Sequence, residues 1–178
     1  TDSTLHFESA SGGIATAFYE YAVTQKMFFS GVSLNDKFEA HFKLTDRVEN
    51  IKDFKNSKYT FSFASDIFDE ILDKLKCGYD VLFIGLPCQV AAIKNLVRIT
   101  TVKGNLITVD LVCHGTPPPI YLQQHIKAIE LKQKQKFTQC FFRDAKFDTS
   151  NYAYTLYTHN SEKPTYVKFV DENDNYQI

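Results

Sequence analysis

Two cysteines follow apolar runs of the kind that form buried strands. Cys88 comes after Asp80–Ile84 and the turn Gly85–Pro87, and Cys113 comes directly after the run 106–112. If the two runs are neighbouring parallel strands, the loops after them converge at the edge of the sheet where α/β proteins bind ligands. The two sulfur atoms are then expected to lie near each other and to face one shared pocket.

Cys88 also opens an expected helix, and the positive end of a helix dipole favours the thiolate form of a cysteine. A thiolate there ligates metal or attacks an electrophile, with His114 as base or proton donor in the second case. Plainer interpretations stay open. Both cysteines suit buried small side chains, and a histidine in a turn is as often a structural hydrogen-bonding group.

Two polar segments offer a second kind of chemistry. Ser9–Gly13 places small residues and backbone N–H groups at a helix start, which suits a phosphate or pyrophosphate; close packing or a tight turn explains its two glycines equally well. Asn56–Tyr59 supplies a cation, a hydroxyl and an aromatic ring, although an exposed loop is the simpler interpretation. Cys77 and Cys140 are expected to be structural, and the other histidines lack metal-type spacing.

The elements that must position these residues alternate between helices and strands. Helices are expected over Ile14–Ala22 (with Ser11 as N-cap), Ser65–Lys76 (capped by Ser65-Asp66), Cys88–Val97, and from Pro118 or Pro119 to about Gln135. Strands are expected in a hairpin over Phe29–Leu34 and Phe38–Leu44, in a buried parallel pair over Asp80–Ile84 and Leu106–Val112, and in three runs over Phe137–Phe142, Tyr152–Thr158 and Tyr166–Val170. The predicted fold class is α/β, with a mixed, largely parallel central sheet flanked by helices on both faces and an antiparallel β addition at the C-terminal end.

The composition is that of one ordinary globular domain. The 178 residues are 44% apolar and 23% charged with a net charge of -1, so no basic field indicates a nucleic acid or anionic membrane partner. No apolar run is long enough for a membrane span, no signal peptide is evident, and the four cysteines are widely spaced. We expect a cytoplasmic protein with free thiols, in which residues 1–178 form a single domain cut from a longer chain.

Five motifs in order along the chain resemble the beta-subunit family of coenzyme F-420 hydrogenases and dehydrogenases, including relatives encoded in polysaccharide gene clusters. The motifs are Ser9–Ala17, Ser57–Tyr59, Val81–Gln89, Asp110–Gly115 and Phe142–Asp144. They cover nearly the whole chain. The resemblance implies an FAD-binding α/β domain with an iron–sulfur cluster, which passes electrons between a redox partner and a two-electron acceptor such as a deazaflavin.

Carried over to matching positions, the resemblance assigns roles to individual residues. Contacts to the flavin dinucleotide would come from Ser11, Gly12, Gly13, Thr16, Ser57, Lys58, Tyr59, Pro87 and Gln89. Cys88 and Cys113 would ligate iron, and His114 is the candidate catalytic proton donor. A 4Fe-4S cluster needs four thiolates as a rule. Family members supply further ones from a downstream Cys-x-x-Cys segment that this sequence does not contain, and many also carry an upstream ferredoxin-like module.

Three functions from different classes follow. The leading one is an FAD and iron–sulfur oxidoreductase with a ferredoxin-like partner and a small-molecule redox substrate, working as a homo-oligomer or as part of a complex, with the fragment alone inactive. The second is a non-catalytic scaffold or assembly subunit in polysaccharide biosynthesis. The third is a thiol enzyme built on Cys88.

Overall fold

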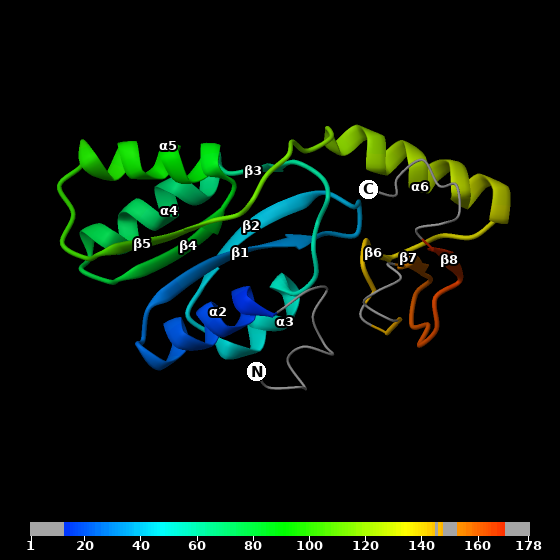
Figure 1. The fold of residues 1–178 in the computed structure, drawn as a ribbon, viewed down its shortest axis with the longest axis horizontal. Coiled ribbons are helices and arrows are strands. Elements are labelled where there is room, and N and C mark those ends of the chain that lie inside the picture. The colour runs from blue at the N-terminus through cyan, green and yellow to red at the C-terminus, as the bar shows by residue number, and fades with distance from the viewer. Residues whose placement is uncertain (1–12, 145, 148–152, 170–178) are drawn as a thin grey trace.

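The computed structural model describes residues 13–144, 146–147 and 153–169. They form a five-stranded mixed sheet with helices on both faces and a three-stranded antiparallel sheet beside it (Figure 1). The predicted α/β class is confirmed. The antiparallel strands at the C-terminal end form a sheet of their own rather than extending the central one.

The central sheet contains the predicted hairpin and the predicted parallel pair. Its strands are Phe28–Leu34 (β1), Ala40–Thr45 (β2), Ser62–Phe63 (β3), Val81–Gly85 (β4) and Leu106–Asp110 (β5), in the order β3-β2-β1-β4-β5. β1 and β2 are antiparallel, with Val32 opposite Phe42. β1, β4 and β5 are parallel, and Gly85 lies opposite Asp110. The loops after β4 and β5 therefore leave the same edge of the sheet.

Helices cover both faces of this sheet (Figure 1). α4 (Ser65–Lys76) and α5 (Pro87–Arg98) pack on one face, and α2 (Ile14–Thr24) and the short α3 (Ile51–Phe54) pack on the other. A 3-10 turn, η1 (Val48–Asn50), precedes α3. Gly31 lets α3 approach β1 closely, because a Cβ atom at that position would lie 2.3 Å from the ring of Phe54. The absence of a side chain at Gly31 thus fixes where Phe54 sits.

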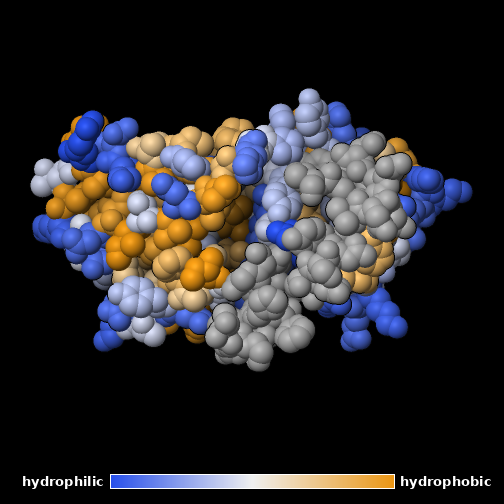
Figure 2. All heavy atoms as spheres, in the orientation of Figure 1, coloured by the Kyte–Doolittle hydropathy of each residue, from blue (hydrophilic) through white to orange (hydrophobic). Residues whose placement is uncertain are grey.

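The strand β5 is less buried than its sequence predicts. It lies at an edge of the sheet, none of its residues is fully buried, and Ile107 is 42% exposed. A short apolar run does not distinguish an edge strand from a central one by periodicity. Figure 2 shows apolar side chains gathered on the visible face of the central-sheet part of the molecule.

Two helices start where expected but have other cap residues than predicted. Ser11, the predicted N-cap of the first helix, lies outside the described residues, and Gly13 occupies the cap position of α2 with a φ of 75°. α4 starts at Ser65 as predicted, but Ala64 is its cap residue. Glycine suits the cap of α2 because it adopts a positive φ without steric strain.

The second sheet is connected through α6 (Pro119–Gln133), and its strands are Gln139–Phe141 (β6), Ala153–Tyr157 (β7) and Tyr166–Phe169 (β8). α6 packs Leu122 and Ile126 against this sheet in a core that also contains Phe38 from the β1–β2 turn and Tyr59. These two aromatic residues join the two sheets. In the part of the chain that the structure describes, no helix is long and apolar enough to cross a membrane.

Candidate functional site

A cavity of about 330 Å³ lies at the carboxyl ends of β1 and β4. Its walls come from the start of α2, the β1–β2 hairpin, α3 with the loop after it, and the loops after β4 and β5. Open α/β sheets bind their ligands at this edge, because loops from several strands converge there. Of the predicted cofactor-binding residues, Gly13, Thr16, Ser57, Lys58 and Gln89 line this one cavity.

Apolar side chains make up much of the wall. Val32 and Phe42 reach it from opposite positions of the hairpin, Phe54 from α3, Ile84 from β4 and Leu111 from the end of β5. Hydrophobic and aromatic walls with a few polar groups are typical of cofactor pockets. Such walls suit the two faces of a planar ring.

The start of α2 supplies hydrogen-bond donors. Gly13, Ile14, Ala15 and Thr16 all line the cavity, and the first helical hydrogen bond is donated by Ala17 N–H to the Gly13 oxygen at 3.2 Å. The backbone N–H groups before Ala17 lack partners within the helix, and a helix start of this kind favours an anion. The predicted contacts of Ser11 and Gly12 lie outside the described residues.

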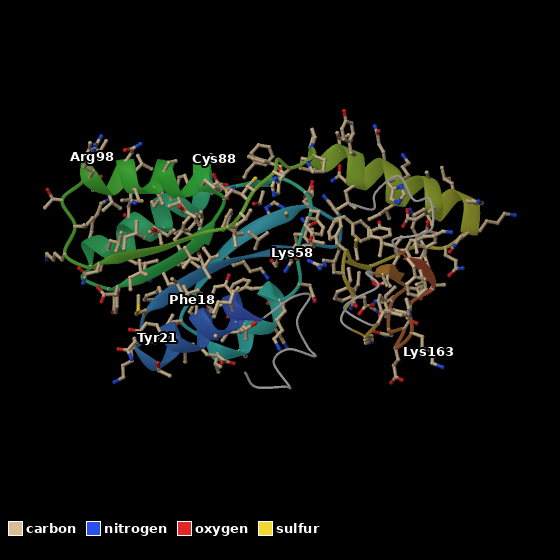
Figure 3. All side chains as sticks on the ribbon, viewed as in Figure 1. Phe18, Tyr21, Lys58, Cys88, Arg98 and Lys163 are labelled. Atoms are coloured by element: carbon tan, nitrogen blue, oxygen red, sulfur yellow. The ribbon has the colours of Figure 1, made fainter. Side chains whose placement is uncertain are left out.

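Lys58 is the cationic group whose setting is most unusual. Its Nζ donates hydrogen bonds to the backbone oxygens of Lys55 at 2.5 Å and Asp53 at 3.3 Å, so it caps the carboxyl end of α3. Burial lowers the pKa of Lys58 to about 7, and the negative charge of Asp53 opposes this shift only in part. Near neutral pH this amine is therefore partly protonated and partly neutral. Figure 3 shows Lys58 near the end of the central sheet that faces the second sheet.

Two polar residues beside Lys58 are incompletely bonded. Asn56 Oδ1 and Thr60 Oγ1 are buried and have no hydrogen-bond partner within the described residues, and both residues line the cavity. Thr60 is only 3% exposed. Asn56 has a φ of 69°, a left-handed conformation that asparagine tolerates better than most residues.

Gln89 and Pro87 shape the loop rather than offer free groups to a ligand. The Gln89 side chain accepts a hydrogen bond from Leu86 N–H at 3.0 Å and donates one to the Ser62 oxygen at 2.7 Å, which ties the start of α5 to β3. Pro87 is the first residue of α5, where its missing N–H has no consequence. No side chain fits at position 85, because a Cβ atom there would lie 2.6 Å from the Phe83 ring.

Tyr59 lies outside the cavity lining. Its ring packs edge-to-face against Phe142 at a centroid distance of 5.6 Å, and its hydroxyl accepts a hydrogen bond of 3.5 Å from Arg143. The predicted flavin-holding residue thus connects the cavity loop to the second sheet, where the Phe142–Asp144 motif lies. Lys58 and Tyr59 are adjacent in the sequence, but only Lys58 lines the cavity.

Cys88 and Cys113 are both exposed, so the simpler expectation of buried small side chains is wrong. Cys88 lies in the first turn of α5 (Figure 3), and Cys113 follows β5, whose end is joined to β4 by a 2.9 Å hydrogen bond from Leu111 N–H to the Gly85 oxygen. Both cysteines therefore follow strands that end at the same edge of the sheet, but neither cysteine lines the cavity. Cys113 Sγ accepts a 3.3 Å hydrogen bond from Gly115 N–H, and His114 is exposed on the same loop.

The described thiols do not make up a complete cluster site. Among the residues that the structure describes, no three His, Cys, Asp or Glu side chains form a group able to hold a metal. Cys77 is exposed at the end of α4, and Cys140 is buried in the second sheet, where burial raises the pKa of its thiol to about 12. Cys140 is therefore inert, in agreement with its predicted structural role.

Sequence reasoning missed several residues of the cavity. Thr60 and the apolar wall of Val32, Phe42 and Phe54 carry no local motif. The alternation along the hairpin shows which side chains share a face, but it does not show that a cavity lies over them.

One comparison with known proteins shows the family, and another shows the fold. The family model described as the C terminus of the beta subunit of coenzyme F-420 hydrogenase/dehydrogenase matches residues 78–173, which is more than half of the chain. A solved structure of the F-420-reducing nickel–iron hydrogenase complex from Methanosarcina barkeri contains a similar chain, with a TM-score of 0.59 and 19% sequence identity. The match covers 95% of this chain and 57% of that one. At this identity the likeness shows a shared fold. No curated protein matches the sequence.

Proposed function

Because the chain belongs to the coenzyme F-420 hydrogenase/dehydrogenase beta-subunit family, we propose that it is the flavin-handling part of an oxidoreductase. In this proposal it binds FAD and serves electron transfer between a ferredoxin-like partner and a two-electron acceptor such as a deazaflavin. The observation that carries the proposal is the cavity at the carboxyl ends of the parallel strands, where the α2 start and the Ser57–Lys58 loop meet. A bound flavin would supply the two-electron chemistry itself.

The residues of the cavity fit a flavin in three respects. The apolar wall suits the faces of the ring system, and the volume of about 330 Å³ is at the lower end of the range for ligand pockets, so it suits the ring rather than the whole dinucleotide. The unpaired oxygens of Asn56 and Thr60 match a ligand with polar edges. The N–H groups at the start of α2 suit the phosphates of the flavin dinucleotide.

Each part of the chain then has a defined task. Gly13 and Thr16 hold the phosphate end, and Phe54 and Ile84 exclude water from the ring. Gln89 keeps the loop after β4 in place through its bonds to Leu86 and Ser62. Lys58 provides a group beside the ring that is able to carry or release one proton near neutral pH.

For iron the described residues supply too few ligands. Cys88 and Cys113 stay our proposed pair of thiolate ligands, because they follow strands that end at the same edge of the sheet. A 4Fe-4S cluster, however, needs four thiolates. We therefore assign no electron step to a cluster held by these residues. Free thiols at all four cysteines fit a reducing compartment such as the cytoplasm.

Titration of FAD into the purified apoprotein, followed by quenching of flavin fluorescence, tests the proposal. Val32→Phe places a larger side chain in the cavity wall, and we expect it to raise the dissociation constant at least about tenfold, a change of roughly 1.4 kcal/mol. Val48→Phe is the matched control, because Val48 is 59% exposed on η1, and it should bind FAD as the unmodified protein does. Circular dichroism and the urea midpoint establish that both variants fold.

No FAD binding by the unmodified protein would contradict the proposal. So would equal FAD affinity in the folded Val32→Phe variant, since the flavin would then bind elsewhere.

A further inference from the structure

Two buried oxygen atoms in the wall of the cavity have no hydrogen-bond partner among the described residues. Asn56 Oδ1 and Thr60 Oγ1 lie on the same loop with Lys58 between them, and neither has a hydrogen-bond partner within the described part of the chain. Buried polar atoms of folded proteins are paired in the great majority of cases. Two unpaired atoms lining the same cavity therefore indicate hydrogen-bonding groups on the molecule that fills it.

The three residues offer a defined pattern of donors and acceptors. Asn56 Oδ1 only accepts hydrogen bonds, and the Thr60 hydroxyl both donates and accepts. The Lys58 ammonium has three N–H groups, and two of them point to the backbone oxygens of Asp53 and Lys55. The third is left to donate. A complementary ligand edge therefore presents one donor, for Asn56 Oδ1, and two acceptors, for Lys58 and Thr60.

This pattern distinguishes between the parts of a flavin dinucleotide. A phosphate presents acceptors and would leave Asn56 Oδ1 without a donor. The adenine edge presents one donor beside one acceptor, which leaves one of the three protein groups unused. The pyrimidinedione edge of the flavin ring carries an N–H group, N3, between two carbonyl oxygens, and so matches all three.

We propose that the loop of Asn56, Lys58 and Thr60 recognises the N3 edge of the ring, with Asn56 Oδ1 accepting a hydrogen bond from N3–H while Lys58 and Thr60 donate to the adjacent carbonyl oxygens. The inference rests on the proposed flavin function and adds the orientation of the ring. A deazaflavin carries the same pyrimidinedione edge, so the same loop recognises either ring.

The charges around Lys58 agree with its role as a donor. Asp53, on α3, is the carboxylate that raises its pKa, and Asp53 itself pairs with Lys43 of β2 at 3.7 Å. Lys55 on the same loop and Tyr19 of α2 are the other titratable groups of the cavity lining, and burial raises the pKa of the Tyr19 hydroxyl, which keeps it neutral. A carbonyl oxygen that carries negative charge would draw a proton onto Lys58.

Binding of FAD and of 3-methyl-FAD, measured by fluorescence quenching, tests the assignment. The methyl group replaces the hydrogen on N3 and leaves the adenine, the phosphates and the rest of the ring unchanged. We expect the unmodified protein to bind FAD at least about tenfold more tightly than 3-methyl-FAD. Asn56→Gly should lose most of this preference; glycine is chosen because it accepts the positive φ at position 56.

The matched control is Asn95→Gly, at an exposed position of α5 outside the cavity, which should keep the full preference. Equal binding of the two ligands by the unmodified protein, or an unchanged preference in folded Asn56→Gly, would overturn the inference and leave the flavin proposal standing. Failure of FAD itself to bind would instead contradict the proposed function.

Discussion

Two buried polar sites of this protein, one beside each sheet, differ in how their hydrogen-bonding groups are paired. In the second sheet the Asp144 carboxylate, only 7% exposed, accepts hydrogen bonds from the hydroxyls of Thr155 at 2.7 Å and Tyr157 at 2.5 Å. Its other oxygen accepts one from Lys146 N–H at 3.1 Å. In the cavity of the central sheet, Asn56 and Thr60 hold buried oxygens that no described residue satisfies.

The difference separates a structural network from a binding site. A buried polar group that is fully paired stabilises one arrangement of the chain, whereas an unpaired one lowers stability unless another molecule completes it. The Asp144 network belongs to the first kind although it lies in one of the family-like motifs. The Asn56–Thr60 loop belongs to the second.

Removal of the Asp144 carboxylate should have the largest effect on stability. Asp144→Ala leaves the buried hydroxyls of Thr155 and Tyr157 without their acceptor, so we expect the free energy of unfolding to fall by about 3 kcal/mol or more. Urea denaturation measures this fall in the free energy of unfolding. Asp144→Asn keeps one acceptor oxygen and should lose less. A change below about 1 kcal/mol in Asp144→Ala would mean that this network is not structural.

Lys58 should make stability depend on pH. Its pKa of about 7 lies below its ordinary value of 10.5, so the folded chain binds fewer protons than the unfolded chain between these values. The stability of the unmodified protein should therefore rise with pH across that window, by about 1 to 2 kcal/mol between pH 7 and 9 relative to Lys58→Met. Urea denaturation of both proteins at several pH values measures the difference between their free energies of unfolding. The contributions of the other titrating groups cancel in this difference. A constant difference across this range would show that Lys58 is as accessible to water as a surface lysine.

Two matched threonines, one at each of these sites, test the difference in pairing, because both are almost fully buried. Thr155→Val removes a hydroxyl bonded to Asp144, so we expect the free energy of unfolding to fall by about 1 to 1.5 kcal/mol. Thr60→Val removes a hydroxyl that has no partner in the described chain, so without ligand we expect no loss and a gain of up to about 1 kcal/mol. Equal losses in the two variants would erase the distinction between the two sites.

The sequence predicts the parts of the fold that depend on local pattern. The polar turn Asn35–Lys37 between two β-prone runs predicts the β1–β2 hairpin, and the apolar runs before Cys88 and Cys113 predict the parallel pair β4 and β5. The exposure of Ile107 does not follow, because the position of a strand in the sheet order depends on contacts distant in sequence.

The candidate site was predictable where a motif marks it. Gly13, Thr16, Ser57, Lys58 and Gln89 belong to motifs and line the cavity. Tyr59 belongs to the same motif as Lys58 but packs on Phe142, because a motif does not show which of its side chains face the cavity. Thr60 gives no signal, because the burial of its hydroxyl depends on segments distant in sequence that meet around the cavity.

The most direct test of the whole account is the effect of Thr60→Val on unfolding, measured by urea denaturation with and without saturating FAD. A ligand that binds only the folded state raises its stability according to its affinity. We therefore expect the variant to be as stable as the unmodified protein, or more stable, without FAD, and less stable than it when FAD is present. A variant that is already less stable without FAD, or a difference that FAD does not change, would contradict the claim that this buried hydroxyl is kept for a bound flavin.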